Sequence, residues 1–355
     1  MALDQTVQLA DAVATAVAEQ RRLRIVGHDS KQQWQWPNAD AEPLDLTHHS
    51  GVIDYQPTEL VITARGGTAL AELNQVLAEQ GQKLASEPPL LGAEPNQGTL
   101  AGAVACGFSG PARPWGGSLR DAVLGVELLN GRGEVLQFGG QVMKNVAGYD
   151  ASRLQAGAWG SLGVLLNVSL RVQPLEACTQ TVQFSMSAVA ANQFARTLAQ
   201  KNLPLTADCW VDGRYYLRLA GHAKTVAQAL EFVGGSAIGD DAAAEFWQQL
   251  RDQQQNFFQS AQAPQLWRLI TPPAAPLPDM AEQQMLLEWQ GGLRWLRHND
   301  ADFVHSYARQ VAGWCWAVGD CQPIDPQQAW LMQRLKRAFD PAAIFASALD
   351  FERAN

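Results

Sequence analysis

The sequence has few cations, few cysteines and no long apolar run, and each shortage excludes a class of protein. Its 355 residues carry 26 Lys and Arg against 35 Asp and Glu, a formal net charge of −9. Nucleic-acid binding depends on neutralising phosphates, so we expect no nucleic-acid partner. No apolar stretch approaches the ~20 residues of a spanning helix, so we expect no direct membrane span and any membrane association to come through partner subunits. The first residues also lack the basic and apolar regions of a secretory signal.

The five cysteines are scattered, and no two of them form a CxxC pair. Scattered thiols without a secretory signal predict a reduced, cytoplasmic protein. They also argue against an iron–sulfur or structural zinc site, so we expect no metal in this chain. An apolar content of 47% excludes intrinsic disorder. The cysteines are Cys106, Cys178, Cys209, Cys315 and Cys321.

The length predicts two domains of ordinary size. In the first half we expect helices over 7–21 and after a cap at Thr68, and strands over 23–26, 52–55, 60–64, 123–129, 135–138 and 164–173. The last of these alternates with period two and predicts a half-buried strand that ends at Pro174. We therefore place a first domain at 1–174 and an α+β cap domain at 175–355, with a final helix over 326–339 that returns to the first domain.

Three glycine clusters in the first half, at 27–31, 98–110 and 157–163, are candidate anion sites. Glycine exposes backbone N–H groups and reaches positive φ at low cost, so successive turns of this kind bind phosphates. The alternative is that the glycines only permit tight turns. The segment 87–117 is so rich in Gly and Pro that we expect it to be irregular and functional. No G-x-G-x-x-G or P-loop motif is present, which disfavours a Rossmann or P-loop site.

Several strings together resemble the FAD-binding domain of the vanillyl-alcohol-oxidase/cresol-methylhydroxylase (PCMH) type. Within that superfamily the chain is most similar to a family of FAD-binding subunits of bacterial glycolate oxidases. The resemblance is dense from 23 to 174 and looser beyond, and its most specific string is 142–150. The strings are Glu-Pro-Pro at 87–89, Thr-Leu-Ala-Gly at 99–102, Gly-Phe-Ser-Gly-Pro at 107–111, Leu-Arg-Asp-Ala-Val-Leu-Gly at 119–125, Val-Met-Lys-Asn-Val-Ala-Gly-Tyr-Asp at 142–150 and Gly-Ser-Leu-Gly-Val at 160–164.

The resemblance implies an α+β fold, a two-subdomain PCMH-type FAD domain followed by an α/β cap, with FAD as cofactor. It also implies a multi-subunit enzyme that oxidises glycolate, a small 2-hydroxy acid, with a sister flavin subunit and an iron–sulfur subunit as partners. Carried onto this sequence, the diphosphate loop is Gly27, His28, Asp29, Ser30 and Lys31, and the flavin channel is Pro89, Thr99, Gly102, Ser109 and Gly110. Arg120 and Asp121 approach the ribityl or diphosphate part, and Gly160, Ser161, Gly163 and Val164 the adenine side.

The sequence also departs from the family. The first loop contains His28, a candidate for covalent flavin attachment, for which a solvated loop histidine is the alternative. The cap lacks the Gly-Glu-His-Gly segment of competent 2-hydroxy-acid dehydrogenases, and its histidines at 222, 298 and 305 are interpreted as structural. Arg294 and Arg297 are candidates to bind a carboxylate, but we interpret their alternation as the polar face of a strand. Lys144 and Tyr149 are the most attractive polar side chains of the first domain, with an N-cap or packing role as the alternative.

Oxidation of a 2-hydroxy acid at a flavin needs a base, and because the cap histidines are interpreted as structural we assign no catalytic residue. The sequence therefore predicts an FAD-binding, accessory or electron-relay subunit of a glycolate oxidase complex. Two alternatives stay open: a self-sufficient flavin dehydrogenase for a 2-hydroxy acid, and a flavin-free structural subunit.

Overall fold

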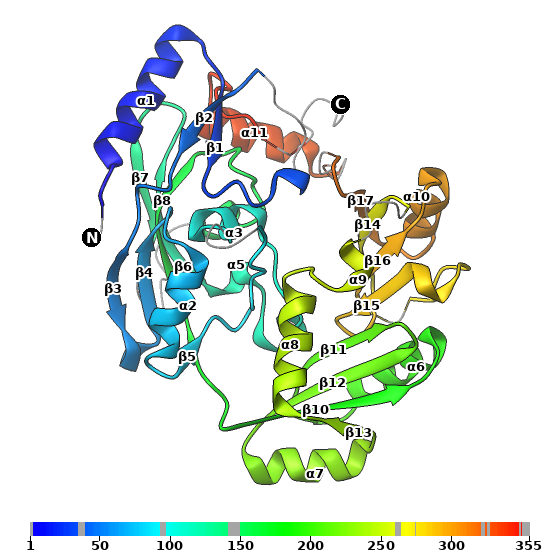
Figure 1. Cartoon of the computed structure of the whole chain (residues 1–355). Coiled ribbons are helices and arrows are strands. Elements are labelled where there is room, and N and C mark those ends of the chain that lie inside the picture. Colours follow the sequence, from blue (N-terminus) through cyan, green and yellow to red (C-terminus); the bar gives the residue numbers. More distant parts are fainter. Residues whose placement is uncertain are drawn as a thin grey trace. The chain divides into compact units, whose positions relative to one another are not determined.

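A computed structural model describes the chain in two compact units (Figure 1). Unit 1 comprises 1–108, 118–174 and 319–355, and unit 2 comprises 109–117 and 175–318. This division breaks the chain after Pro174, but it assigns Ser109–Gly117 to unit 2 and residues 319–355 to unit 1, whereas from the sequence we placed them in the domains 1–174 and 175–355. The described residues are 3–34, 40–92, 97–140, 150–259, 264–273, 275–320, 324, 327–347 and 349. Lys144, Tyr149, Cys321 and residues 142–149 of the most specific string lie outside them.

Unit 1 is built on an antiparallel sheet of five strands in the order β3-β4-β8-β6-β7. Their bounds are β3 Val52–Gln56, β4 Val61–Arg65, β6 Val123–Leu129, β7 Val135–Gly139 and β8 Val164–Arg171. Strands β6 and β7 form the hairpin that the sequence predicts around Asn130-Gly131. Two small sheets accompany it, a parallel pair of β1 (Leu23–Val26) and β2 (Glu42–Asp45) and an antiparallel pair of β5 (Gln82–Lys83) and β9 (Gln173–Pro174).

Strand β8 is buried on both faces, so the prediction of a half-buried strand is wrong. It is the central strand of the sheet, and helix α3 packs against it. Its polar Ser169 is accommodated because the hydroxyl is paired with that of Thr63 on β4 at 2.8 Å. A buried polar group with a partner is tolerated at the centre of a sheet.

The helices of unit 1 include α1 (Thr6–Glu19), α2 (Leu70–Ala78), α3 (Leu100–Cys106), α5 (Leu119–Ala122) and α11 (Ala329–Phe339). Short 3-10 turns are η1 (Gln32–Trp34), η2 (Pro57–Glu59) and η3 (Arg153–Gln155). Two expectations need correction. Thr68 does not cap α2; its hydroxyl accepts a hydrogen bond from the Gly51 N–H at 2.9 Å. The segment 87–117 is not wholly irregular, because α3 forms within it, capped by the Thr99 hydroxyl.

Unit 2 is an antiparallel sheet of eight strands in the order β13-β10-β12-β11-β15-β16-β14-β17. The strands are β10 Cys178–Ser185, β11 Leu205–Val211, β12 Arg214–Gly221, β13 Ser236–Ile238, β14 Leu266–Ile270, β15 Met285–Glu288, β16 Leu293–Arg297 and β17 Trp314–Ala317. The helices are α4 Arg113–Gly116, α6 Ala188–Ala199, α7 Ala223–Val233, α8 Asp240–Arg251, α9 Asn256–Gln259, η4 Glu282–Gln284 and α10 Ala301–Gln310. Residues of α6, α7 and α10 share one core with the sheet, which confirms the predicted α+β layering.

Arg294 in β16 is fully buried, which corrects its interpretation as part of a polar face. Its guanidinium donates to the carbonyl oxygens of Ala275 at 2.7 Å, Pro276 at 2.6 Å and Gly291 at 2.8 Å, and also to the Tyr307 hydroxyl. The Arg294 guanidinium therefore links the loop at 275–276 to strand β16, and all four of these hydrogen bonds lie within unit 2.

Candidate functional site

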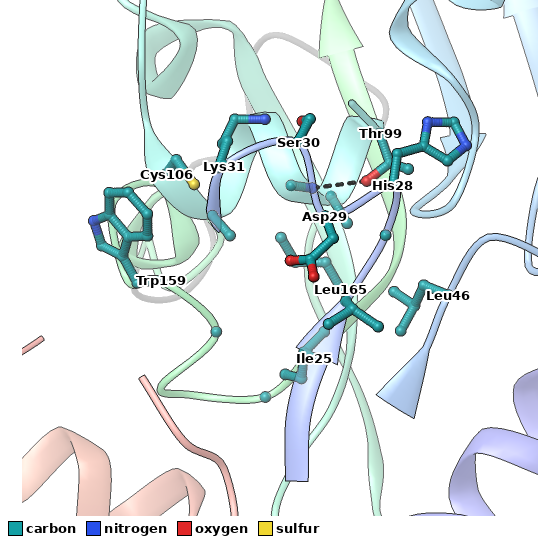
Figure 2. A pocket seen from close by; sticks show the side chains of 17 residues that line it. Ile25, His28, Asp29, Ser30, Lys31, Leu46, Thr99, Cys106, Trp159 and Leu165 are labelled. Carbon is teal, nitrogen blue, oxygen red and sulfur yellow. Dashed lines mark hydrogen bonds between the residues drawn. The ribbon is translucent and has the colours of Figure 1, made fainter. Parts of the chain in front are cut away.

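A pocket in unit 1 brings the three glycine clusters of the sequence together (Figure 2). The hollow is open to solvent, and the empty space in it, counted together with its open mouth, is about 670 Å³. Nine of the sixteen predicted cofactor residues line it. They are Gly27, His28, Asp29, Ser30, Lys31, Thr99, Gly102, Gly160 and Gly163. The loop after β1, the start of α3 and the turn before β8 therefore meet at one hollow.

The loop after β1 lies so close to α3 that only glycine fits at Gly27. A Cβ atom there would lie 2.4 Å from the Thr99 hydroxyl oxygen. That hydroxyl accepts a hydrogen bond from the Gly102 N–H at 3.3 Å, drawn as the dashed line in Figure 2. A Cβ on Gly102 would lie 3.1 Å from the same oxygen and 3.9 Å from the Lys31 Nζ. Bare backbone thus forms one wall of the pocket, as close approach to a ligand requires.

Lys31 is the only lysine or arginine among the lining residues that the structure describes. Its side chain is 5% exposed, and within the described ranges its Nζ has no hydrogen-bond acceptor. Burial lowers the pKa of Lys31 and raises that of the neighbouring Cys106 thiol to about 12. The thiol therefore stays neutral and provides no counter-charge. A buried ammonium without an acceptor is costly, and an anion in the pocket would offset that cost.

The loop also contains an acidic residue, Asp29, which adopts a positive φ of 51°. Its carboxylate accepts a hydrogen bond from the Arg24 guanidinium at 2.8 Å and another from Gln32. Arg24 thereby neutralises a charge that would repel a phosphate. The His28 ring lies at the opposite end of the loop from Lys31, and its buried Nδ1 has no partner among the described residues (Figure 2). This orphaned nitrogen is a second polar atom available to a ligand.

The rest of the lining is apolar or aromatic and was missed from the sequence. Trp159 contributes its indole at a positive φ of 51°, and Phe108 packs edge-on behind it with ring centroids 5.6 Å apart. Ala105 and Cys106 lie three and four residues after Gly102, on the same face of α3. This helical spacing is the signal that would have identified them, had a helix been expected there. Ile25, Leu46 and Leu165 complete the apolar side.

Seven predicted cofactor residues do not line this pocket. Asp121 caps its own helix, because its carboxylate accepts from the Ser118 N–H at 2.9 Å and the Ser118 hydroxyl at 2.7 Å. Gly110 belongs to unit 2, where its carbonyl accepts a hydrogen bond from the Trp289 indole at 3.0 Å. Val164 is in the core of unit 1, and the Ser161 carbonyl accepts from Lys336 at 2.9 Å. The others are Pro89 and Ser109, which are buried, and Arg120, which is exposed.

Two of the three histidines of unit 2 make local contacts, and the third is exposed. The His298 ring stacks on Phe303 with centroids 4.4 Å apart, and its Nδ1 lies 3.1 Å from the Asp300 backbone nitrogen. His305 lies edge-on to Trp267, and its Nδ1 is 3.4 Å from the Cys315 sulfur. His222 precedes α7 and is exposed. These positions agree with the structural interpretation made from the sequence.

Unit 2 also buries charges. Burial raises the pKa of Glu288 to about 8 and that of Asp208 to about 6, and it lowers the pKa of Arg268 to about 9. The Arg268 guanidinium lies over the rings of Trp316 at 4.9 Å, Trp289 at 5.6 Å and Trp295 at 5.7 Å. The Trp295 indole donates to Glu288 at 2.9 Å. This region is a buried polar network within the cap.

Over the described ranges, no group of three or more His, Cys, Asp or Glu side chains is placed to hold a metal ion. Within the same ranges, every helix is too short or too polar to cross a membrane. Four cysteines are free thiols: Cys106, Cys178, Cys209 and Cys315.

Comparisons with known proteins identify the family to which the chain belongs. Residues 2–139 match the family described as "FAD binding domain". The glycolate oxidase subunit GlcE of Escherichia coli (strain K12) is 39% identical over 347 residues, which cover 96% of each chain. The glycolate oxidase subunit GlcD of Bacillus subtilis (strain 168) is 24% identical over 183 residues, which cover 51% of this chain and 38% of GlcD. The chain thus carries an FAD-binding domain of the PCMH type.

The fold has a counterpart among solved structures. An alkyldihydroxyacetonephosphate synthase superposes with a TM-score of 0.69, covering 95% of this chain and 73% of the synthase chain. The sequence identity is 14%, so this likeness concerns the fold alone.

Proposed function

Because the chain belongs to the family of the glycolate oxidase subunit GlcE, we propose that it holds FAD as one subunit of a glycolate-oxidising complex. The observation that carries this proposal is the convergence of three glycine-containing turns and the buried Lys31 on one pocket. Its two kinds of lining suit a cofactor that joins a diphosphate to flat aromatic rings.

The polar side of the pocket receives the diphosphate in this proposal. In it, backbone N–H groups of 27–31 and the Lys31 ammonium face the phosphate oxygens, and the absence of a side chain at Gly27 leaves room for Thr99 beside the loop. Trp159 and the apolar residues beside it cover a ring system. A flavin held here would supply redox chemistry that these side chains lack, which suits a relay of electrons.

The proposed role is accessory or electron-relaying, with a sister flavin subunit performing most of the substrate chemistry. Oxidation of a 2-hydroxy acid requires a base near the flavin, and the candidates among the described lining residues are His28, Asp29 and Lys31, of which this proposal assigns Lys31 to the diphosphate. Asp29 is neutralised by Arg24, and two of the three cap histidines make local contacts. We further propose GlcD-like and iron–sulfur subunits as partners, and a cytoplasmic location for the chain.

The test is to purify the chain alone and with its neighbouring subunits, then to count flavins and measure glycolate-dependent dye reduction. A yellow chain that is inactive alone but active in the complex supports the proposal. Turnover by the isolated chain would favour the self-sufficient dehydrogenase, and a chain that stays colourless after incubation with FAD would favour the flavin-free subunit. Release of the flavin on acid denaturation would exclude covalent attachment through His28.

A further inference from the structure

The C-terminal segment of unit 1 holds together the two loops that line the pocket. We call the set formed by Lys336, Asp340 and residues 344–346 the C-terminal clasp. Lys336 is near the end of α11, and none of the clasp lines the pocket itself. Figure 1 shows α11 and the chain after it beside β1 and β2.

Lys336 is the centre of the clasp. Its Nζ donates to the Ser161 carbonyl at 2.9 Å, the Phe345 carbonyl at 2.8 Å and the Asp340 carboxylate at 2.6 Å. Three acceptors match the three donors of an ammonium. Ser161 lies between Gly160 and Gly163, so this contact fixes the turn before β8.

The other end of the clasp fixes the strand before the diphosphate loop. Asp340 accepts hydrogen bonds from the backbone N–H groups of Ile344 at 3.0 Å and Phe345 at 2.9 Å. The segment so held pairs with the start of β1, because the Leu23 N–H donates to the Ile344 carbonyl at 2.7 Å and the Ala346 N–H to the Leu23 carbonyl at 2.9 Å. Strand β1 then runs directly into Gly27.

Strand β1 and the turn at 160–163 are also packed closely against each other. Gly160 has φ +73°, and a Cβ atom there would lie 3.3 Å from the Ile25 side chain in β1. A small shift of either loop would therefore change the wall of the pocket. Asp340 is 1% exposed, and the ion pair with Lys336 is shielded from solvent, so salt screens it little.

We propose that Lys336 and Asp340 are positioning residues for the cofactor: they fix the turn at 160–163 against β1 and so pre-form the pocket. This inference rests on the proposed FAD site. Pre-forming a site removes part of the ordering cost of binding, so loosening the clasp weakens FAD binding although no clasp side chain lines the pocket.

The experiment compares Lys336→Met with Arg337→Met, which removes an exposed cation from the same helical turn. FAD dissociation is followed by flavin fluorescence at a temperature where far-UV circular dichroism shows both variants folded. We expect release at least about tenfold faster from Lys336→Met and unchanged from Arg337→Met. Lys336→Arg, which keeps the charge and several donors, should restore most of the affinity.

A second measurement separates positioning from stability. Amide hydrogen exchange of the chain without FAD should rise in residues 23–31 and 157–163 of Lys336→Met, and not in α2. If Lys336→Met is less heat-stable but retains FAD and loop protection like the wild type, the clasp is merely structural and the inference is wrong. Lys336→Gln repeats the test if Lys336→Met does not fold. A wild-type chain that binds no FAD overturns the proposed function, whereas the exchange result still decides whether the clasp orders the loops.

Discussion

Replacing Lys31 with Met should make the chain without FAD more stable and its FAD binding weaker. The free protein buries this ammonium without an acceptor, so an apolar side chain of similar length removes a desolvation penalty. We expect a gain of about 1 kcal/mol in the free energy of unfolding, or roughly 2 °C in Tm for a chain of this size. A gain in stability together with a loss of FAD affinity is the combination expected of an unpaired buried charge that serves a ligand.

The loss of binding follows from the charge-assisted contact that the ammonium offers to a phosphate oxygen. Such a bond is worth about 1.5–3 kcal/mol, which corresponds to a roughly 10- to 100-fold weaker affinity for FAD. The assay is a titration of the FAD-free chain, followed through flavin fluorescence. Lys201→Met, at an exposed position of unit 2, is the matched control and should change neither quantity.

The pH dependence of FAD binding provides an independent check. Burial lowers the pKa of Lys31 in the free chain, and a bound diphosphate raises it again. FAD affinity of the wild type should therefore be full below the lowered pKa and fall as pH rises through it, while the affinity of Lys31→Met stays flat over that window. Wild-type affinity and an unchanged pH profile in Lys31→Met would refute the placement of the diphosphate beside this residue.

Three further predictions concern other parts of the chain. Gly102→Trp should place an indole beside the Lys31 ammonium and abolish flavin retention, measured as flavin per chain, whereas Gly239→Trp, where a Cβ meets no atom, should retain it. Arg294→Met should lower the free energy of unfolding by about 3 kcal/mol in a denaturant titration, because it leaves several buried carbonyl oxygens without a donor; a loss below about 0.5 kcal/mol would contradict this. Glu288 has its folded-state pKa raised from 4.5 to about 8, so the folded chain binds the extra proton and unfolding free energy should fall as pH rises between these values. Glu288→Gln should flatten that slope, and an identical slope in both proteins would count against the buried carboxyl.

Much of the fold could be predicted from local pattern. The hairpin around Asn130-Gly131 and its strand β6 lie where the sequence predicts them, because turn residues between two apolar segments specify both locally. The resemblance to the glycolate oxidase subunit family is confirmed by the 39% identity with GlcE. The predictions that failed depend on tertiary context.

Two failures illustrate that dependence. Helix α3 forms in a glycine-rich segment because Thr99 caps it and its small side chains pack against β8, a strand far along the chain. A sequence pattern treats Arg294 as a polar residue and so predicts that it is exposed. In the folded chain it is buried, because the carbonyl oxygens of Ala275 and Pro276 accept its hydrogen bonds. In the same way, the sequence identified the turns that form the pocket but not Trp159 or Cys106, which enter it only through folding.

Residues Ser109–Gly117 belong to unit 2 although the residues on both sides of them belong to unit 1, and this affects how the chain can be divided into fragments. The polypeptide crosses between its two halves at 108–109, 117–118, 174–175 and 318–319, so no single cut separates them. A fragment ending at Pro174 would carry away α4, and the remainder would lose both the carbonyl that caps the Trp289 indole and the Arg113 guanidinium 4.6 Å above that ring. A fragment of residues 175–318 would therefore lack part of its own unit, and we expect it to be less stable than the same unit within the whole chain.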